Sequence, residues 1–132
     1  MISAPDCVVA SDEITAGSRL GPWMALKNVI DLDVTRVSNC VKVDDAVAGI
    51  HEGINSSMWT IGLSVSGNEF GATPEEFQAM TATEIEQRKQ AAEKVLYAAG
   101  AHYVIDTIAE LPQVINQIEA RMKNGECPTY IN

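Results

Sequence analysis

Two adjacent acids, Asp44 and Asp45, are the residues of this sequence best placed to do chemistry. They end a short apolar run, Cys40–Val43, that is typical of a buried strand, and apolar residues follow at helical spacing at Val47 and Ile50. Ligands of open α/β sheets bind at the carboxyl ends of strands, where a carboxylate can hold a hard cation such as Mg²⁺. The same carboxylates could instead cap the helix that follows by accepting hydrogen bonds from its first N–H groups. The local sequence leaves both interpretations open.

A basic residue, Arg19, is expected at the same edge of the sheet. It ends the loop after the apolar run Cys7–Ala10, which we interpret as another strand. A fixed cation beside Asp45, an acid able to hold Mg²⁺, would suit a phosphoryl or phosphonyl group. The loop Ser66–Gly71 should leave a further strand at this edge, either as part of a ligand site or as a simple turn flanked by glycines.

Alternating strands and helices must position these residues. Apolar and β-branched runs predict strands at 7–10, 39–43, 58–65 and 102–105. Helical spacing and capping signals predict helices that begin near residues 21, 45, 73, 83 and 107. In the first of these helices, Trp23, Leu26 and Ile30 are expected to share one apolar face. This order is typical of parallel βαβ units in one α/β domain, with a loose tail over residues 125–132.

The composition narrows the class of partner and the compartment. The chain has 132 residues, of which 46% are hydrophobic and 20% charged, as in an ordinary globular domain. Its net charge of −9 argues against nucleic acid or an anionic membrane as a partner. Cys7, Cys40 and Cys127 have no metal-ligand spacing, and there is no membrane-length apolar run or signal pattern, so we expect a cytoplasmic protein.

A series of motifs runs in order through the chain and carries a specific resemblance. The segments are Ser18–Asn28, Cys40–Asp45, Gly53, Met58–Gly62, Ser66–Thr73 and Tyr97–Tyr103. Together they closely resemble the phosphonoacetaldehyde hydrolases of the haloacid dehalogenase-like superfamily. The resemblance extends from about Pro5 to Pro128 and corresponds to the carboxyl-terminal half of such an enzyme. It implies a partial domain, with part of a Rossmann-like, doubly wound parallel sheet that lacks the nucleophile strand and the cap.

The resemblance also implies an activity and its cofactor. Members of this family hydrolyse the carbon–phosphorus bond of phosphonoacetaldehyde, a small anionic phosphonate from 2-aminoethylphosphonate degradation, to acetaldehyde and phosphate. They use Mg²⁺, a Schiff-base lysine and an aspartyl-phosphate intermediate, and the full-length enzyme is expected to be a homodimer. The nucleophilic aspartate, the Schiff-base lysine and the threonine that helps bind the phosphoryl group have no counterpart here. We therefore expect this chain alone to be inactive.

Two site residues carry over from the family. Arg19 matches the basic residue that neutralises the nucleophile and the phosphoryl charge, and Asp45 matches the acid that holds Mg²⁺. Asp44 stands where many relatives have glycine, so it is expected either on the metal or just behind it. Gly49 stands where many superfamily members place another acid, which leaves fewer metal ligands on this chain.

Three accounts of the chain remain open on the sequence. It is a fragment of a normal enzyme, a half that assembles with a separate chain carrying the amino-terminal half, or a non-catalytic remnant that serves as a binding module. In the family, the nucleophile strand lies between the strand of Asp45 and the strand that matches Cys7–Ala10. Without it, one edge of the Asp45 strand is bare, and such an edge invites self-association.

Overall fold

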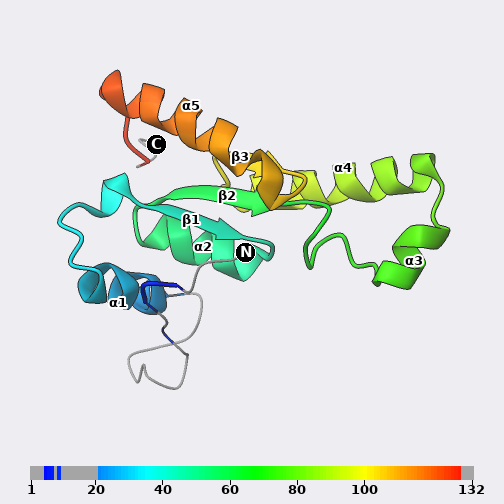
Figure 1. Cartoon of the computed structure of the whole chain (residues 1–132), viewed down its shortest axis with the longest axis horizontal. Helices are drawn as coiled ribbons and strands as arrows, with labels where there is room; N and C mark the ends of the chain where they lie inside the picture. The colour runs from blue at the N-terminus through cyan, green and yellow to red at the C-terminus, as the bar shows by residue number, and fades with distance from the viewer. Residues whose placement is uncertain (1–4, 8, 10–20, 129–132) are drawn as a thin grey trace.

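The computed structural model describes residues 5–7, 9 and 21–128, and within them helices alternate with parallel strands. The elements are α1 (Trp23–Asp31), the 3₁₀ helix η2 (Val37–Asn39), β1 (Val41–Asp44), α2 (Val47–Asn55), β2 (Trp59–Leu63), α3 (Pro74–Ala79), α4 (Ala82–Ala98), β3 (Tyr103–Ile105), η3 (Ile108–Glu110) and α5 (Leu111–Lys123). The predicted α/β class is therefore confirmed over the described part of the chain (Figure 1).

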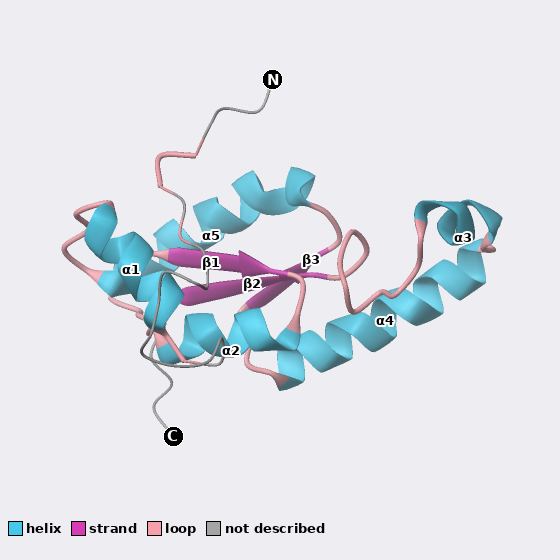
Figure 2. Ribbon diagram, turned by 90° about the horizontal axis from the view of Figure 1, so that it is seen from below, coloured by secondary structure: helices cyan, strands magenta, loops and turns pink. Residues whose placement is uncertain are grey.

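The sheet has three strands in the order β1-β2-β3, and both strand pairs are parallel. Val43 of β1 lies opposite Ile61 of β2, which lies opposite Tyr103 of β3. All three strands thus end at one edge of the sheet. No strand among residues 5–7, 9 and 21–128 pairs with the other side of β1. Figure 2 shows this small sheet between its helices.

Alternation along β2 places side chains on both faces of the sheet. Trp59 and Ile61 point toward α5, where they pack with Val114 and Ile118. On the other face Gly62 meets α4, and a Cβ at this glycine would lie 3.0 Å from a side-chain carbon of Leu96. Glycine thus lets α4 approach the strand closely. α2 also packs on this face, so the sheet is covered on both sides.

Trp59 has polar neighbours although its side chain is fully buried. The guanidinium of Arg121 lies 4.7 Å from the centre of the Trp59 ring, and the ring of His102 lies 5.0 Å away. His102 Nδ1 accepts a hydrogen bond from the backbone N–H of Thr60 at 3.0 Å. Because Nδ1 must be unprotonated to accept this bond, Nε2 carries the proton that faces the carbonyl oxygen of Pro128 at 3.3 Å. Burial lowers the pKa of His102, which keeps the ring neutral.

The face that α1 buries differs from the predicted one. Ala25 and Val29, four residues apart, pack against Met58, whereas Trp23 is 42% exposed and Ile30 is 74% exposed. The two smaller residues face the core because α1 lies close to the residues that precede β2. The predicted inner face is therefore wrong at Trp23 and Ile30.

The structure describes the predicted first strand and the carboxyl-terminal tail only in part. Of the predicted first strand, Cys7 and Val9 have no regular secondary structure, while Val8 and Ala10 lie outside the described residues. Within the tail expected to be loose, Glu126 pairs with Arg121 at 3.2 Å, and the carbonyl oxygen of Pro128 lies 3.3 Å from His102 Nε2. Residues 129–132 lie outside the described part.

The described helices are also informative about membranes. None of the helices within residues 21–128 combines the length and the apolar character that crossing a bilayer requires.

Candidate functional site

Asp45 lies where the sequence predicts it, immediately after β1 and before the first turn of α2. Its Oδ2 accepts a hydrogen bond from the backbone N–H of Asn68 at 2.8 Å. Asn68 belongs to the loop that follows β2, so this bond brings the ends of β1 and β2 together. Within the described part of the chain, only Asn68 donates a hydrogen bond to this carboxylate.

The loop over Asp45 is fixed by several contacts. A Cβ at Gly67 would lie 2.5 Å from Asp45 Cβ and 2.7 Å from the carbonyl oxygen of Leu63, so only glycine permits this approach. Glu69 Oε1 accepts a hydrogen bond from the N–H of Val47, the first residue of α2, at 3.4 Å. Ser66 N–H donates to the carbonyl oxygen of Asp106 at 3.3 Å. The loop is thus attached to the ends of all three strands and is part of the site's framework.

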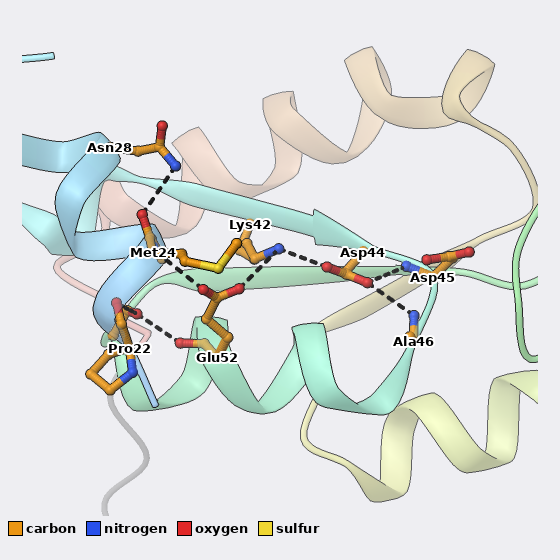
Figure 3. A network of polar contacts seen from close by, with 10 residues as sticks. Pro22, Met24, Asn28, Lys42, Asp44, Asp45, Ala46 and Glu52 are labelled. Atoms are coloured by element: carbon orange, nitrogen blue, oxygen red, sulfur yellow. Dashed lines mark hydrogen bonds and ion pairs between the residues drawn. The ribbon is translucent and has the colours of Figure 1, made fainter. Parts of the chain in front are cut away.

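Asp44 has a different environment from Asp45. Its side chain is only 8% exposed, and Oδ2 accepts from Lys42 Nζ at 2.7 Å. Oδ1 accepts from the backbone N–H groups of Asp45 at 2.9 Å and of Ala46 at 3.0 Å (Figure 3). Asp44 therefore fixes the turn that precedes α2, while the Asp45 side chain points to the loop. The capping interpretation is wrong in its strict form, because α2 begins at Val47, its N-cap residue is Ala46, and no side-chain cap bond is formed there.

Lys42 and Glu52 complete a buried network that sequence reasoning missed. Lys42 Nζ lies 3.5 Å from Glu52 Oε1, and the Glu52 side chain is 3% exposed. Glu52 Oε2 accepts a hydrogen bond from the N–H of Ala25, in the first turn of α1, at 3.2 Å. The network therefore runs from α1 to the end of β1 (Figure 3). The signal in the sequence was a charged residue at two positions where the elements pack against one another, Lys42 in the strand and Glu52 in the helix. Charged residues are rarely buried unless they are paired.

The described residues fit a magnesium site in part. No group of three or more His, Cys, Asp or Glu side chains in this part of the chain is arranged to hold a metal ion. Mg²⁺ commonly uses only one or two protein carboxylates, and substrate phosphate oxygens and water complete its shell. Asp45 can supply one such carboxylate from a fixed strand end. Arg19, the other predicted site residue, lies outside the described residues.

A groove of about 500 Å³ opens beside this edge. The loop after β2 forms one wall through Ser66, Gly67 and Phe70, and α3 forms the other through Pro74 and Phe77. The wall residues are mostly apolar. The groove therefore places an apolar surface next to the loop that contacts Asp45.

Two known proteins are similar in sequence to nearly the whole of this chain. Phosphonoacetaldehyde hydrolase from Klebsiella pneumoniae subsp. pneumoniae is 60% identical over 125 residues, which are 95% of this chain and 46% of that protein. The enzyme of the same name from Salmonella typhi is 56% identical over 124 residues, which are 94% of this chain and 46% of that protein. No protein-family model matches the chain.

The fold has a solved counterpart. A crystal structure of a phosphonoacetaldehyde hydrolase-like protein from Oleispira antarctica superimposes with a TM-score of 0.91 at 44% sequence identity. The superposition covers 96% of this chain and 45% of that one. Nearly all of this chain is thus similar in sequence and fold to about half of a phosphonoacetaldehyde hydrolase, consistent with its carboxyl-terminal half, and it spans about half the length of the curated relatives it matches.

Proposed function

We propose that this chain provides the carboxyl-terminal half of the catalytic core of a phosphonoacetaldehyde hydrolase. The reaction cleaves the carbon–phosphorus bond of phosphonoacetaldehyde, releases acetaldehyde and phosphate, and depends on Mg²⁺. The observation that carries this proposal is the 60% identity over 125 residues with the Klebsiella enzyme. The position of Asp45 at the carboxyl end of β1 supports it, because ligands of such sheets bind there.

In this proposal Asp45 supplies the protein carboxylate of the magnesium site. The N–H of Asn68 holds one of its oxygens at 2.8 Å and so orients the carboxylate before any ligand binds. Bound Mg²⁺ would neutralise charge that develops on the phosphoryl oxygens. Arg19 would add a fixed positive charge, the role that the family resemblance gives it.

The chain needs a second half to perform this reaction. The sequence has no match to the family's nucleophilic aspartate or Schiff-base lysine, so we propose that these 132 residues alone do not turn over substrate. The bare side of β1 favours an assembly role, since an added strand would pair with backbone groups that no described strand covers. A binding or assembly module without catalysis is the second candidate function.

A reconstitution experiment tests the proposal. The chain is produced together with the amino-terminal half of the Klebsiella relative, and acetaldehyde is measured with a coupled alcohol dehydrogenase at saturating Mg²⁺. We expect no turnover from either half alone and magnesium-dependent turnover from the mixture. As a control substitution, Asp33→Asn in this chain should leave the turnover of the mixture unchanged. Asp33 is exposed and has a positive φ of 57°, which asparagine tolerates.

Two results would count against the proposal. Steady turnover by the chain alone would show that it contains an unrecognised nucleophile. A stable complex of the two halves that never releases acetaldehyde would favour the module without catalysis.

A further inference from the structure

The Asp44 carboxylate controls the backbone of the residue next to it. Oδ1 accepts hydrogen bonds from the N–H groups of both Asp45 and Ala46, at 2.9 and 3.0 Å. Oδ2 is held by Lys42 Nζ at 2.7 Å. Because both oxygens are engaged, the position of Asp44 sets the position of the turn from which the Asp45 side chain projects.

A glycine in α2 provides the space for this carboxylate. A Cβ built on Gly49 would overlap Cγ and both carboxylate oxygens of Asp44. Gly49 is buried, in the first turn of α2. Glycine is a poor helix former, so a glycine here calls for a packing reason. The Asp44 side chain is that reason.

The same carboxylate is coupled to α1. Lys42 lies between Asp44 and Glu52, and Glu52 holds the N–H of Ala25. A displacement of Asp44 would therefore disturb the contact that fixes the start of α1. In the sequence, α1 begins four residues after Arg19. Of the two residues assigned to the proposed site, Asp45 is bonded to this buried network through Asp44, and Arg19 is close in sequence to α1, which the network contacts.

We propose that Asp44 is a positioning residue for Asp45, seated in the space left by Gly49 and coupled through Lys42 and Glu52 to the first turn of α1. Mutation of a group that hydrogen-bonds and orients a metal ligand typically lowers metal affinity or activity by about 10- to 100-fold. The functional meaning of this device rests on the proposed magnesium role of Asp45. Its geometry does not, and the experiment separates the two.

Hydrogen exchange on the whole chain, without magnesium or substrate, tests the geometry. Asp44→Gly removes the acceptor of the Asp45 and Ala46 amides, so we expect both to exchange roughly 10- to 100-fold faster. The Asn68 amide should follow, since it is bonded to the Asp45 carboxylate. The amide of Ile61, in the middle of β2, reports any loss of global stability, so the three amides at the site should be accelerated clearly more than that of Ile61.

Two further variants make the test specific. Asp44→Asn keeps an oxygen for the two N–H groups but loses the ion pair with Lys42, so its effect should be smaller than that of Asp44→Gly. Gly49→Ala should displace the carboxylate and accelerate the same three amides. Added to Asp44→Gly, however, Gly49→Ala should change nothing further, because the group that it displaces is absent. Asp33→Asn, the same change at an exposed site, should leave these amides unaffected.

Several outcomes would overturn the proposal. These are unprotected Asp45 and Ala46 amides in the unmodified chain, a uniform acceleration that includes β2, and additive effects of Asp44→Gly and Gly49→Ala. In the reconstituted enzyme, the magnesium concentration for half-maximal activity should rise roughly 10- to 100-fold in Asp44→Gly. The expected exchange pattern without any magnesium-dependent turnover would refute the proposed function and leave the positioning device standing.

Discussion

Replacing Lys42 by methionine gives the most direct test of the buried network. The substitution keeps much of the aliphatic side chain but removes the cation between two carboxylates. Those carboxylates, on Asp44 and Glu52, are only 8% and 3% exposed. Removing one partner of a buried ion pair costs about 3–5 kcal/mol, because a charge is left buried without compensation.

The remaining contacts place the expected loss near the lower end of that range. Asp44 keeps two backbone N–H donors, and Glu52 keeps the N–H of Ala25. We therefore expect Lys42→Met to lower the free energy of unfolding by about 3 kcal/mol. With a urea dependence of about 1–3 kcal/mol per molar, the unfolding midpoint should fall by roughly 1–3 M.

Urea unfolding followed by circular dichroism, with every variant at the same protein concentration, measures this shift. Lys27→Met is the matched control, because Lys27 pairs with Asp31 at 2.9 Å on the exposed side of α1. Such i,i+4 pairs contribute about 0.3–0.5 kcal/mol, so the control midpoint should hardly move. Adding Glu52→Gln to Lys42→Met should recover part of the loss, since glutamine keeps an acceptor for Ala25 without the charge. Equal midpoints for Lys42→Met and Lys27→Met would refute the reasoning.

Three further results are expected. In the reconstituted enzyme, Asp45→Asn should remove most activity and excess Mg²⁺ should restore part of it; a variant with unchanged rate and magnesium dependence would exclude Asp45 from the site. Because burial lowers the pKa of His102 in the folded chain, His102 of the unfolded chain becomes protonated at a higher pH than His102 of the folded chain as the pH falls. The contribution of His102 to stability should therefore be complete above the ordinary histidine pKa of about 6.5 and should be lost as the pH falls through the pKa of His102 in the folded chain. Urea titrations at pH 5 to 8 measure this dependence, which His102→Gln should flatten. The isolated chain should self-associate in light scattering through the side of β1 that no strand of the described residues covers, and a clean monomer with strongly protected amides at Val41 and Val43 would contradict this.

Local patterns were sufficient for the elements that contain their own signals. The apolar run that ends at Asp44 forms β1, and the helical spacing after it forms α2. The helix predicted to begin near residue 107 begins there as η3, and Glu110 Oε2 accepts a hydrogen bond from the N–H of Thr107 at 3.2 Å. These features depend on neighbours in the sequence, so a short window contains the information.

Contacts between distant segments were not predictable in the same way. Ala25 and Val29, not Trp23 and Ile30, form the inner face of α1, because its packing against Met58 sets that face. Likewise, the ion pair of Lys42 with Glu52 joins a strand to the following helix. It cannot be predicted from the alternation of residues in the strand or from the helical spacing of apolar residues.

The two adjacent acids show the limit most clearly. Nothing in the pair Asp44-Asp45 says which carboxylate turns inward. The inward direction of Asp44 depends on the space at Gly49 and on the cation of Lys42. Such a glycine, four residues after Asp45, becomes informative only when the helix is placed against the strand end.

The common direction of the strands restricts how this sheet can grow. A tight hairpin joins only antiparallel neighbours, whereas a parallel neighbour requires a crossover of about a dozen residues or more. A strand that continues the parallel pattern beyond β1 must therefore come from a segment far away in sequence or from another polypeptide. A cut between such a strand and β1 would sever a long connection and no tight turn. The fold could therefore be divided at this edge into two separately encoded halves. If the proposed function holds, regained hydrolase activity would then indicate that the two halves have associated in the cell.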